Sequence, residues 1–197
     1  MMRCRMQTKI YTAPAEEPVT IEEAKLQCRV DTADEDVLFE RLISAARRYV
    51  ETFQRRALIT QTWEAYLDAW PSEAYIDLPY PPLQSVTSIT YKDTAGSAST
   101  FGSANYIVDI GRTPGRVYLA YDASWPSTTL YPTSGITVRY VCGYGATGKS
   151  VPAETRQGLL LLVAHLYENR EATVERALTF IPFGVEALLW GEREFRF

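Results

Sequence analysis

The segment PAETRQGLLLLVAHLYENRE, residues 152–171, predicts one long helix. Its middle, residues 159–164, is apolar on all sides, and a helix without a polar face is normally surrounded by other elements. Pro152 suits a helix start because its missing N–H costs nothing there, and Glu154 suits the positive end of the helix dipole. The apolar run is far shorter than the roughly 20 residues that cross a bilayer. We therefore expect a core helix of a soluble protein.

The composition is that of a globular protein, with 197 residues of which 46% are hydrophobic and 22% charged. This length suits one domain with a large insertion, or two small domains. The formal net charge of -4 argues against a generally basic nucleic-acid binder. Cys4, Cys28 and Cys142 form no CxxC pair, which favours a reducing compartment, and no secretion signal is evident at the N-terminus. The sequence therefore predicts a cytoplasmic protein.

Residues 1–18 show little periodicity, which predicts an arm rather than packed structure. Thr20 and Glu23 then form a capping box, which predicts a helix near residues 21–29.

The segment VDTADED, residues 30–36, holds three aspartates but lacks the glycine and the spacing of an EF-hand loop. We expect Thr32 or Asp34 to cap the next helix instead of binding calcium, with Glu35 and Asp36 at its positive end.

A second helix is predicted near residues 35–53 by a broad apolar face. One stripe of this face comprises Leu38, Leu42, Ala45, Tyr49 and Phe53, and it is widened by Phe39, Ile43, Ala46 and Val50. The other face carries Glu40, Arg47, Arg48 and Glu51. Arg47, Arg48, Arg55 and Arg56 form the most basic patch of the chain, a candidate contact for DNA or for another subunit. The alternative is a solvated helix face, because glutamates are interleaved with the arginines.

The region near residues 58–143 predicts an inserted antiparallel β domain. Residues 59–68 alternate in the manner of a strand, and further strand patterns cover residues 74–78, 86–91, 106–110, 116–120 and 136–142. The turns between them are short and rich in proline and glycine, and such turns join antiparallel strands. The helical core would then comprise residues 1–57 and 144–197. The fold class is α+β, a helical bundle with this β insertion and a C-terminal tail.

After the long helix, residues 173–181 predict a loop or an exposed arm, and residues 185–190 predict one or two helical turns closed by Gly191. The final residues are aromatic and basic but belong to no periodic element, so they should not be buried in their own domain. We interpret Trp190, Phe195, Arg196 and Phe197 as a docking tail, since aromatic residues and arginine are enriched at interfaces. A frayed terminus is the alternative.

The segment GYGATGKS, Gly143 to Ser150, satisfies the P-loop pattern and suggests an alternative function in nucleotide binding. Three features argue against it. Pro152 moves the helix start past the loop, hairpins rather than βα units precede the loop, and no apolar strand ending in an aspartate follows it. The glycines then form the turn from the β insertion back to the core helix.

Other chemistry is sparse. The single histidine, His165, lies in the apolar run of the long helix, and no Ser-His-Asp, Cys-His or zinc-ligand set can be assembled around it. We expect a binding protein without a cofactor or a metal, and not an enzyme.

Six motifs in this order resemble the head-tail connector (adaptor) proteins of long-tailed bacteriophages, relatives of which occur in gene transfer agents. The motifs are PVTIEEAKLQCRVD (residues 18–31), ARRYVE (46–51), ALITQTWE (57–64), PPLQSVTSITY (81–91), YVCGYG (140–145) and VPAETRQGLLLLVAHLYENRE (151–171). The likeness runs from about Pro18 to Trp190. Its specificity lies in the order and spacing of the motifs.

The resemblance implies a structural virion neck protein, made in the cytoplasm of the host bacterium. Such adaptors form a ring, typically dodecameric, under the portal protein; they extend the DNA channel and provide the platform for the stopper or tail-completion protein. Packaged DNA would pass through the lumen without sequence-specific binding, and no membrane is involved. The resemblance assigns portal binding to the C-terminal tail, here Trp190, Arg193, Phe195, Arg196 and Phe197.

Overall fold

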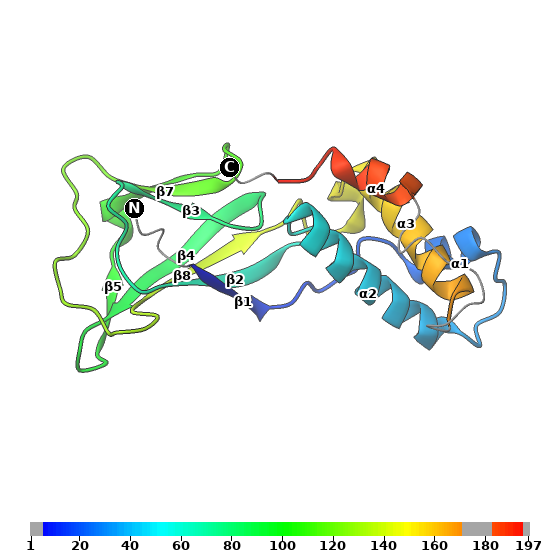
Figure 1. Cartoon of the computed structure of the whole chain (residues 1–197), viewed down its shortest axis with the longest axis horizontal. Coiled ribbons are helices and arrows are strands. Elements are labelled where there is room, and N and C mark those ends of the chain that lie inside the picture. Colours follow the sequence, from blue (N-terminus) through cyan, green and yellow to red (C-terminus); the bar gives the residue numbers. More distant parts are fainter. Residues whose placement is uncertain (1–5, 171–182, 195–197) are drawn as a thin grey trace. The chain divides into compact units, whose positions relative to one another are not determined.

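The computed structural model describes residues 6–170 and 183–194 (Figure 1). The chain divides into two compact units. Met1–Pro14 and Thr60–Gly143 form a β unit, and Ala15–Ile59 and Tyr144–Phe197 form a helical unit. The fold is therefore a mixed α+β fold, as predicted. Among the described residues, no helix combines the length and apolar character needed to cross a membrane.

The helical unit contains four helices in the described part of the chain. They are α1 (Ile21–Cys28), α2 (Asp36–Gln54), α3 (Ala153–Glu168) and α4 (Phe183–Trp190). Helix α3 contacts each of the other three (Figure 1). The helices predicted near residues 21–29, 35–53 and 152–171 correspond to α1, α2 and α3, although α3 ends at Glu168 rather than at residue 171. The long helix of the sequence is thus the centre of this unit.

The two helix starts in the N-terminal part differ from each other. The capping box of α1 is confirmed, since the Glu23 N–H donates to Thr20 Oγ1 at 3.2 Å and the Thr20 N–H donates to Glu23 Oε2 at 2.9 Å. The predicted cap of α2 is wrong, because its N-cap is Glu35 and not Thr32 or Asp34. The Glu35 carboxylate accepts hydrogen bonds from Tyr167 and Arg170 at the end of α3. A contact with another helix therefore takes the place of a local side-chain cap.

The core of the helical unit lies between α2, α3 and α4. Helix α2 contributes Phe39, Ile43, Ala46 and Val50, each at most 2% exposed. Helix α3 contributes Leu159, Leu162 and Val163, each at most 4% exposed. A Cβ atom at Gly158 would lie 3.0 Å from Leu189 Cδ2, so the absence of a side chain there lets α3 and α4 approach closely.

The sequence expectation for these two helices needs two corrections. Burial of α3 on all sides is wrong, because Leu160, Leu161, Ala164 and His165 are only half-buried, although Leu160 and Leu161 still pack against the core. On α2, Ala45 and Tyr49 are exposed, so the second of the two apolar stripes supplies the fully buried residues, while Leu42 and Phe53 of the first stripe pack against the core only in part. A broad apolar stripe does not reveal which of its edges faces the partner helix.

The β unit holds two antiparallel sheets, with strand orders β1-β2-β8-β4-β5 and β3-β7-β6 (Figure 1). The strands are β1 (Gln7–Thr12), β2 (Gln61–Leu67), β3 (Tyr75–Leu78), β4 (Leu83–Lys92), β5 (Ala98–Phe101), β6 (Tyr106–Asp109), β7 (Gly115–Leu119) and β8 (Ile136–Cys142). In β2, the buried residues are Gln61, Trp63, Ala65 and Leu67, which is the alternation predicted from the sequence. Trp63 lies opposite Tyr140 of β8 in the sheet register.

Two strands were not expected from the sequence. The prediction of an arm over residues 1–18 is wrong for β1, which pairs with β2 along the edge of the larger sheet. Strand β5 pairs with β4 at the opposite edge. No residue of β1 is buried, and Phe101 is the one buried residue of β5. Edge strands with so little burial carry no apolar alternation by which a sequence could reveal them.

The two sheets approach closely at Gly115. A Cβ atom at this position would lie 2.4 Å from Leu83 Cβ, so no other residue type fits without displacement of β4. Gly115 belongs to the TPG segment that the sequence marks as a turn. Here the glycine also starts β7 and permits the packing of one sheet on the other.

Candidate interaction surfaces

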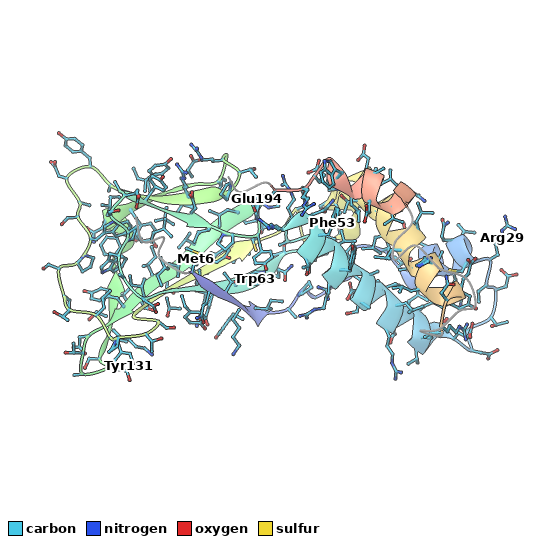
Figure 2. The ribbon with its side chains drawn as sticks, in the orientation of Figure 1. Met6, Arg29, Phe53, Trp63, Tyr131 and Glu194 are labelled. Atoms are coloured by element: carbon cyan, nitrogen blue, oxygen red, sulfur yellow. The ribbon has the colours of Figure 1, made fainter. Side chains whose placement is uncertain are left out.

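The residues that follow α4 are bound to the C-terminal end of α2. The Glu194 N–H donates to the Gln54 carbonyl at 2.9 Å, and Arg56 Nε donates to the Glu192 carbonyl. Glu194 is only 6% exposed (labelled in Figure 2). The expectation that the C-terminal residues stay off their own domain is therefore wrong for residues 192–194. Phe195, Arg196 and Phe197 lie outside the described residues.

An aromatic–arginine cluster, formed by Tyr49, Phe53, Trp190 and Arg193, lies at this end of the helical unit; Phe53 is labelled in Figure 2. The Arg193 guanidinium carbon is 4.8 Å from the Phe53 ring centre and 5.1 Å from that of Trp190. Such cation–π contacts hold an arginine against aromatic faces. Trp190 nevertheless remains 52% exposed and Tyr49 36%. Two predicted tail residues, Trp190 and Arg193, thus meet in a surface that combines aromatic and cationic groups.

The buried side chain of Gln54 links three helices at this end of the helical unit. Its fully buried amide Nε2 donates to Thr155 Oγ1 at 3.1 Å and to the Leu189 carbonyl at 3.0 Å, which joins α2, α3 and α4. The sequence analysis missed Gln54. It continues the buried series of Ile43 and Val50 at helical spacing, and a polar residue on a core stripe is the signal that could have identified it.

Tyr144 supports the same region from the segment before α3. Its hydroxyl donates to Glu192 Oε2 at 2.9 Å. Burial raises the pKa of Tyr144 well above its ordinary value, so the hydroxyl stays protonated and remains a donor. The start of the tail is therefore fixed by backbone, side-chain and ring contacts together.

The predicted basic patch does not form one surface. Arg47 is only 6% exposed, and it donates through Nε to Glu17 Oε2 at 2.7 Å and through Nη1 to Glu51 Oε2 at 3.1 Å. Glu51 in turn accepts the Leu58 N–H at 3.1 Å. Burial alone would lower the pKa of Arg47, but its bonds to both carboxylates outweigh burial and raise it. The assignment of Arg47 to the outer face of its helix is therefore wrong.

The other three arginines of the patch also separate. Arg56 Nε lies 3.9 Å from Glu192 Oε2, in addition to its hydrogen bond to the Glu192 carbonyl. Arg48 and Arg55 are exposed, and Arg55 ends α2 in the left-handed conformation with φ 55°. Arg41, which the sequence analysis did not select, is also exposed. The sequence feature that could have identified Arg41 is its spacing of seven residues from Arg48, which places both residues on the same side of a helix.

The segment from Gly143 to Ser150 has the geometry of a turn. The Ser150 N–H donates to the Thr147 carbonyl and the Val151 N–H to the Gly148 carbonyl, both at 3.1 Å. A P-loop directs such N–H groups at phosphates from the start of its helix. Here α3 begins only at Ala153, and a Cβ atom at Gly148 would lie 2.2 Å from the Pro18 carbonyl oxygen. The glycines are therefore explained by the close packing of the chain, and not by a nucleotide.

The described residues contain no group of three or more His, Cys, Asp or Glu side chains that could hold a metal ion. His165 is half-buried, and its Nδ1 lies 3.4 Å from Asn169 Nδ2.

Residues 18–109 match the family model described as Phage gp6-like head-tail connector protein. The resemblance to head-tail connectors is confirmed. Solved structures are similar to this protein over nearly its whole length. A chain from the neck of an empty gene transfer agent particle, computed with C6 symmetry, is 27% identical with a TM-score of 0.78, and 97% of each chain is covered.

Two further chains are 25% identical, again with 97% of each chain covered. One comes from the virion of a native gene transfer agent particle, with a TM-score of 0.78. The other comes from the neck of a native particle computed with C12 symmetry, with a TM-score of 0.73. The comparison with curated proteins gives no match.

Proposed function

We propose that this protein is a structural virion component, a head-tail adaptor of the neck in a tailed phage or a gene transfer agent. The observation that carries the proposal is the match to a neck chain over 97% of both chains, with a TM-score of 0.78. A similarity over both units indicates that the helical unit and the β unit serve the same kind of assembly. In this role the protein is made in the host bacterial cytoplasm, works in the virion, and needs neither cofactor nor catalysis.

The adaptor assembles as a ring of identical subunits under the portal protein. We propose twelve copies, a number supported by the neck structure computed with C12 symmetry. The ring extends the DNA channel, through which packaged DNA passes without sequence-specific binding, and its far side receives the stopper or tail-completion protein. In the proposed subunit, the β domain expected over residues 58–143 is inserted into the helical bundle, and the N-terminal residues expected in the bundle instead add strand β1 to that β domain.

The tail residues Trp190, Arg193, Phe195, Arg196 and Phe197 bind the portal in this proposal. The exposed part of the aromatic–arginine cluster supports it, because aromatic residues and arginine dominate the binding energy of interfaces. Arg48 and Arg55 are exposed and available for DNA or for another subunit, whereas Arg47 and Arg56 hold internal carboxylates.

The test is the native mass of the purified protein, alone and mixed with its cognate portal ring, over a range of concentrations. We expect a ring-sized complex with the portal. Two truncations sharpen the test. Removal of residues 195–197 should weaken portal attachment and leave the melting temperature unchanged. Removal of residues 192–197 should also lower the melting temperature, because the hydrogen bonds from Arg56 to Glu192 and from Glu194 to Gln54 are lost.

A protein that stays monomeric with its portal at every concentration would contradict the adaptor function. A ring that forms equally well without residues 195–197 would keep the adaptor function and exclude the tail as its portal contact.

A further inference from the structure

The outward face of α2 carries a row of three arginines. Arg41 and Arg48 are seven residues apart in α2, which places them on one side of the helix about 10.5 Å apart, and Arg55 follows seven residues later as the C-cap of the helix. All three are exposed, and none forms an ion pair with another residue in the described ranges. The small side chains of Ala45 and Thr52 lie between the arginines, so little side-chain bulk protrudes from the helix there.

The outward face of α3 is acidic at both ends and apolar in the middle, which complements the arginines and small side chains of α2. Leu160, Leu161 and Ala164 are half-buried in its middle, and Leu160 and Leu161 also pack against the core with part of their side chains. Glu154 and Glu168 are exposed at its two ends, and neither is ion-paired within the part of the chain that the structure describes. The two carboxylates are fourteen residues apart, about 21 Å along the helix, which is also the separation of Arg41 and Arg55.

Arg41 and Arg48 lie on the side of α2 opposite the buried Ile43 and Val50. On α3, Glu154, Leu161 and Glu168 follow one another at intervals of seven residues on the side away from the buried Leu159, although Leu161 still touches the core. Helices α2 and α3 pack on each other through residues such as Ile43 and Leu159, so their outward faces cannot meet within one molecule. A second copy can place its α3 on the first copy's α2 and still present its own α2 to a third copy. Such a head-to-tail contact generates a ring when the rotation between subunits closes.

We propose that the α2 arginine row of one subunit packs against the outward face of α3 in the next subunit of the same ring. The arginines at both ends of the row pair with Glu154 and Glu168, while Leu161 and its neighbours pack over Ala45 and Thr52. This inference rests on the proposed ring and specifies its subunit contact. The choice of a second copy follows from charge and spacing together: a DNA phosphate backbone would match the arginines but would leave the apolar, acid-ended face of α3 without a function.

Charge exchange in the full-length protein tests the contact. The variant R41E/R55E makes both faces acidic, and E154R/E168R makes both faces basic, so each alone should associate about tenfold or more weakly than wild type in native mass measurements with the portal ring present. An equimolar mixture should recover rings of alternating subunits, because every contact then joins opposite charges. The control K92E/R112E reverses two exposed charges of the β unit and should assemble like wild type.

The outcomes separate the contact from the function. Rings that form normally from both charge variants would overturn the contact while leaving the adaptor function intact. Impaired variants whose mixture does not recover would also overturn it, since the loss would not come from charge pairing. Loss of duplex DNA binding by R41E/R55E with unchanged assembly would assign the arginine row to DNA instead. Wild type that never forms a ring with the portal would contradict the adaptor function itself.

Discussion

The two sides of helix α2 use the same residue type for opposite purposes. Arg47 is 6% exposed and joined to Glu17 and Glu51, whereas Arg48, the next residue, is exposed and forms no ion pair with the described residues. One arginine holds the N-terminal segment against its own subunit, and the other is available to a partner. Burial and pairing, and not residue type, therefore separate the residues that stabilise the subunit from those that can assemble it.

The largest expected effect extends this comparison to α3. Leu162→Asp places a carboxylate at a position that is 4% exposed, and we expect it to lower the free energy of unfolding by about 4 kcal/mol or more. Leu161→Asp, one residue away on the outward face, should cost much less stability and should instead weaken assembly. Thermal unfolding of the isolated proteins followed by native mass with the portal distinguishes the two. Equal melting temperatures for both variants would show that the inward and outward sides of α3 are wrongly assigned.

The next prediction compares the neighbouring arginines directly. Arg47→Met leaves the carboxylates of Glu17 and Glu51 without their shared cation, and should destabilise the protein by about 3 kcal/mol. Arg48→Met should change stability by less than about 0.5 kcal/mol, as for most surface substitutions. Urea denaturation of both variants measures the difference. The distinction between the two faces fails if Arg48→Met proves the more destabilising.

The sequence predicted best those elements whose apolar period coincides with burial. Residues 61–67 alternate in sequence and in structure, and the capping box of Thr20 and Glu23 forms as expected. Strand β1 was missed because β2 holds it by backbone hydrogen bonds and none of its side chains is buried. The cap of α2 was wrongly predicted, since Glu35 is the N-cap and its carboxylate is bound by Tyr167 and Arg170, which lie more than a hundred residues later in the chain. Long-range contacts of this kind leave no local signal.

For the candidate surfaces, the sequence predicted which residue types take part but not which of them are exposed or which partners they contact. Four arginines close in sequence suggested one basic patch, but α2 turns Arg47 inward and leaves Arg48 outside. Which of them is buried depends on the position of Glu17, a residue of the preceding segment. Trp190 and Arg193 were selected as aromatic and basic residues near the terminus, but their contacts with the Phe53 ring depend on the docking of α4. Residue type identified the groups, and the tertiary fold decided their partners.

A smaller effect is expected at Gln54. Gln54→Met keeps the approximate size of the side chain but removes the amide that donates to Thr155 and to the Leu189 carbonyl. We expect a loss of about 1–2 kcal/mol in the free energy of unfolding, because both acceptors are then left without this donor. Gln157→Met, at an exposed position of α3, is the matched control and should leave stability nearly unchanged. Equal stability of the two variants in urea denaturation would show that the Gln54 amide does not fasten the three helices.

The smallest expected effect concerns pH and the link between Glu35 and the end of α3. Hydrogen bonds from Tyr167 and Arg170 lower the pKa of the Glu35 carboxyl below its ordinary value of 4.5. A carboxyl whose folded-state pKa is lowered contributes stability above its unfolded-state pKa, and this contribution is lost as the pH falls through the folded-state value. Wild type should therefore melt at a higher temperature than Glu35→Gln at pH 7, and the difference should shrink between pH 5 and pH 3.

Glu40→Gln, at an exposed position of α2, controls for the loss of one negative charge and should follow the wild-type curve in parallel. A difference between Glu35→Gln and wild type that persists unchanged at pH 3 would mean that the ionised carboxylate is not what joins α2 to α3. The link between α2 and α3 would then rest on apolar packing and on the hydrogen bond from Gln54 to Thr155.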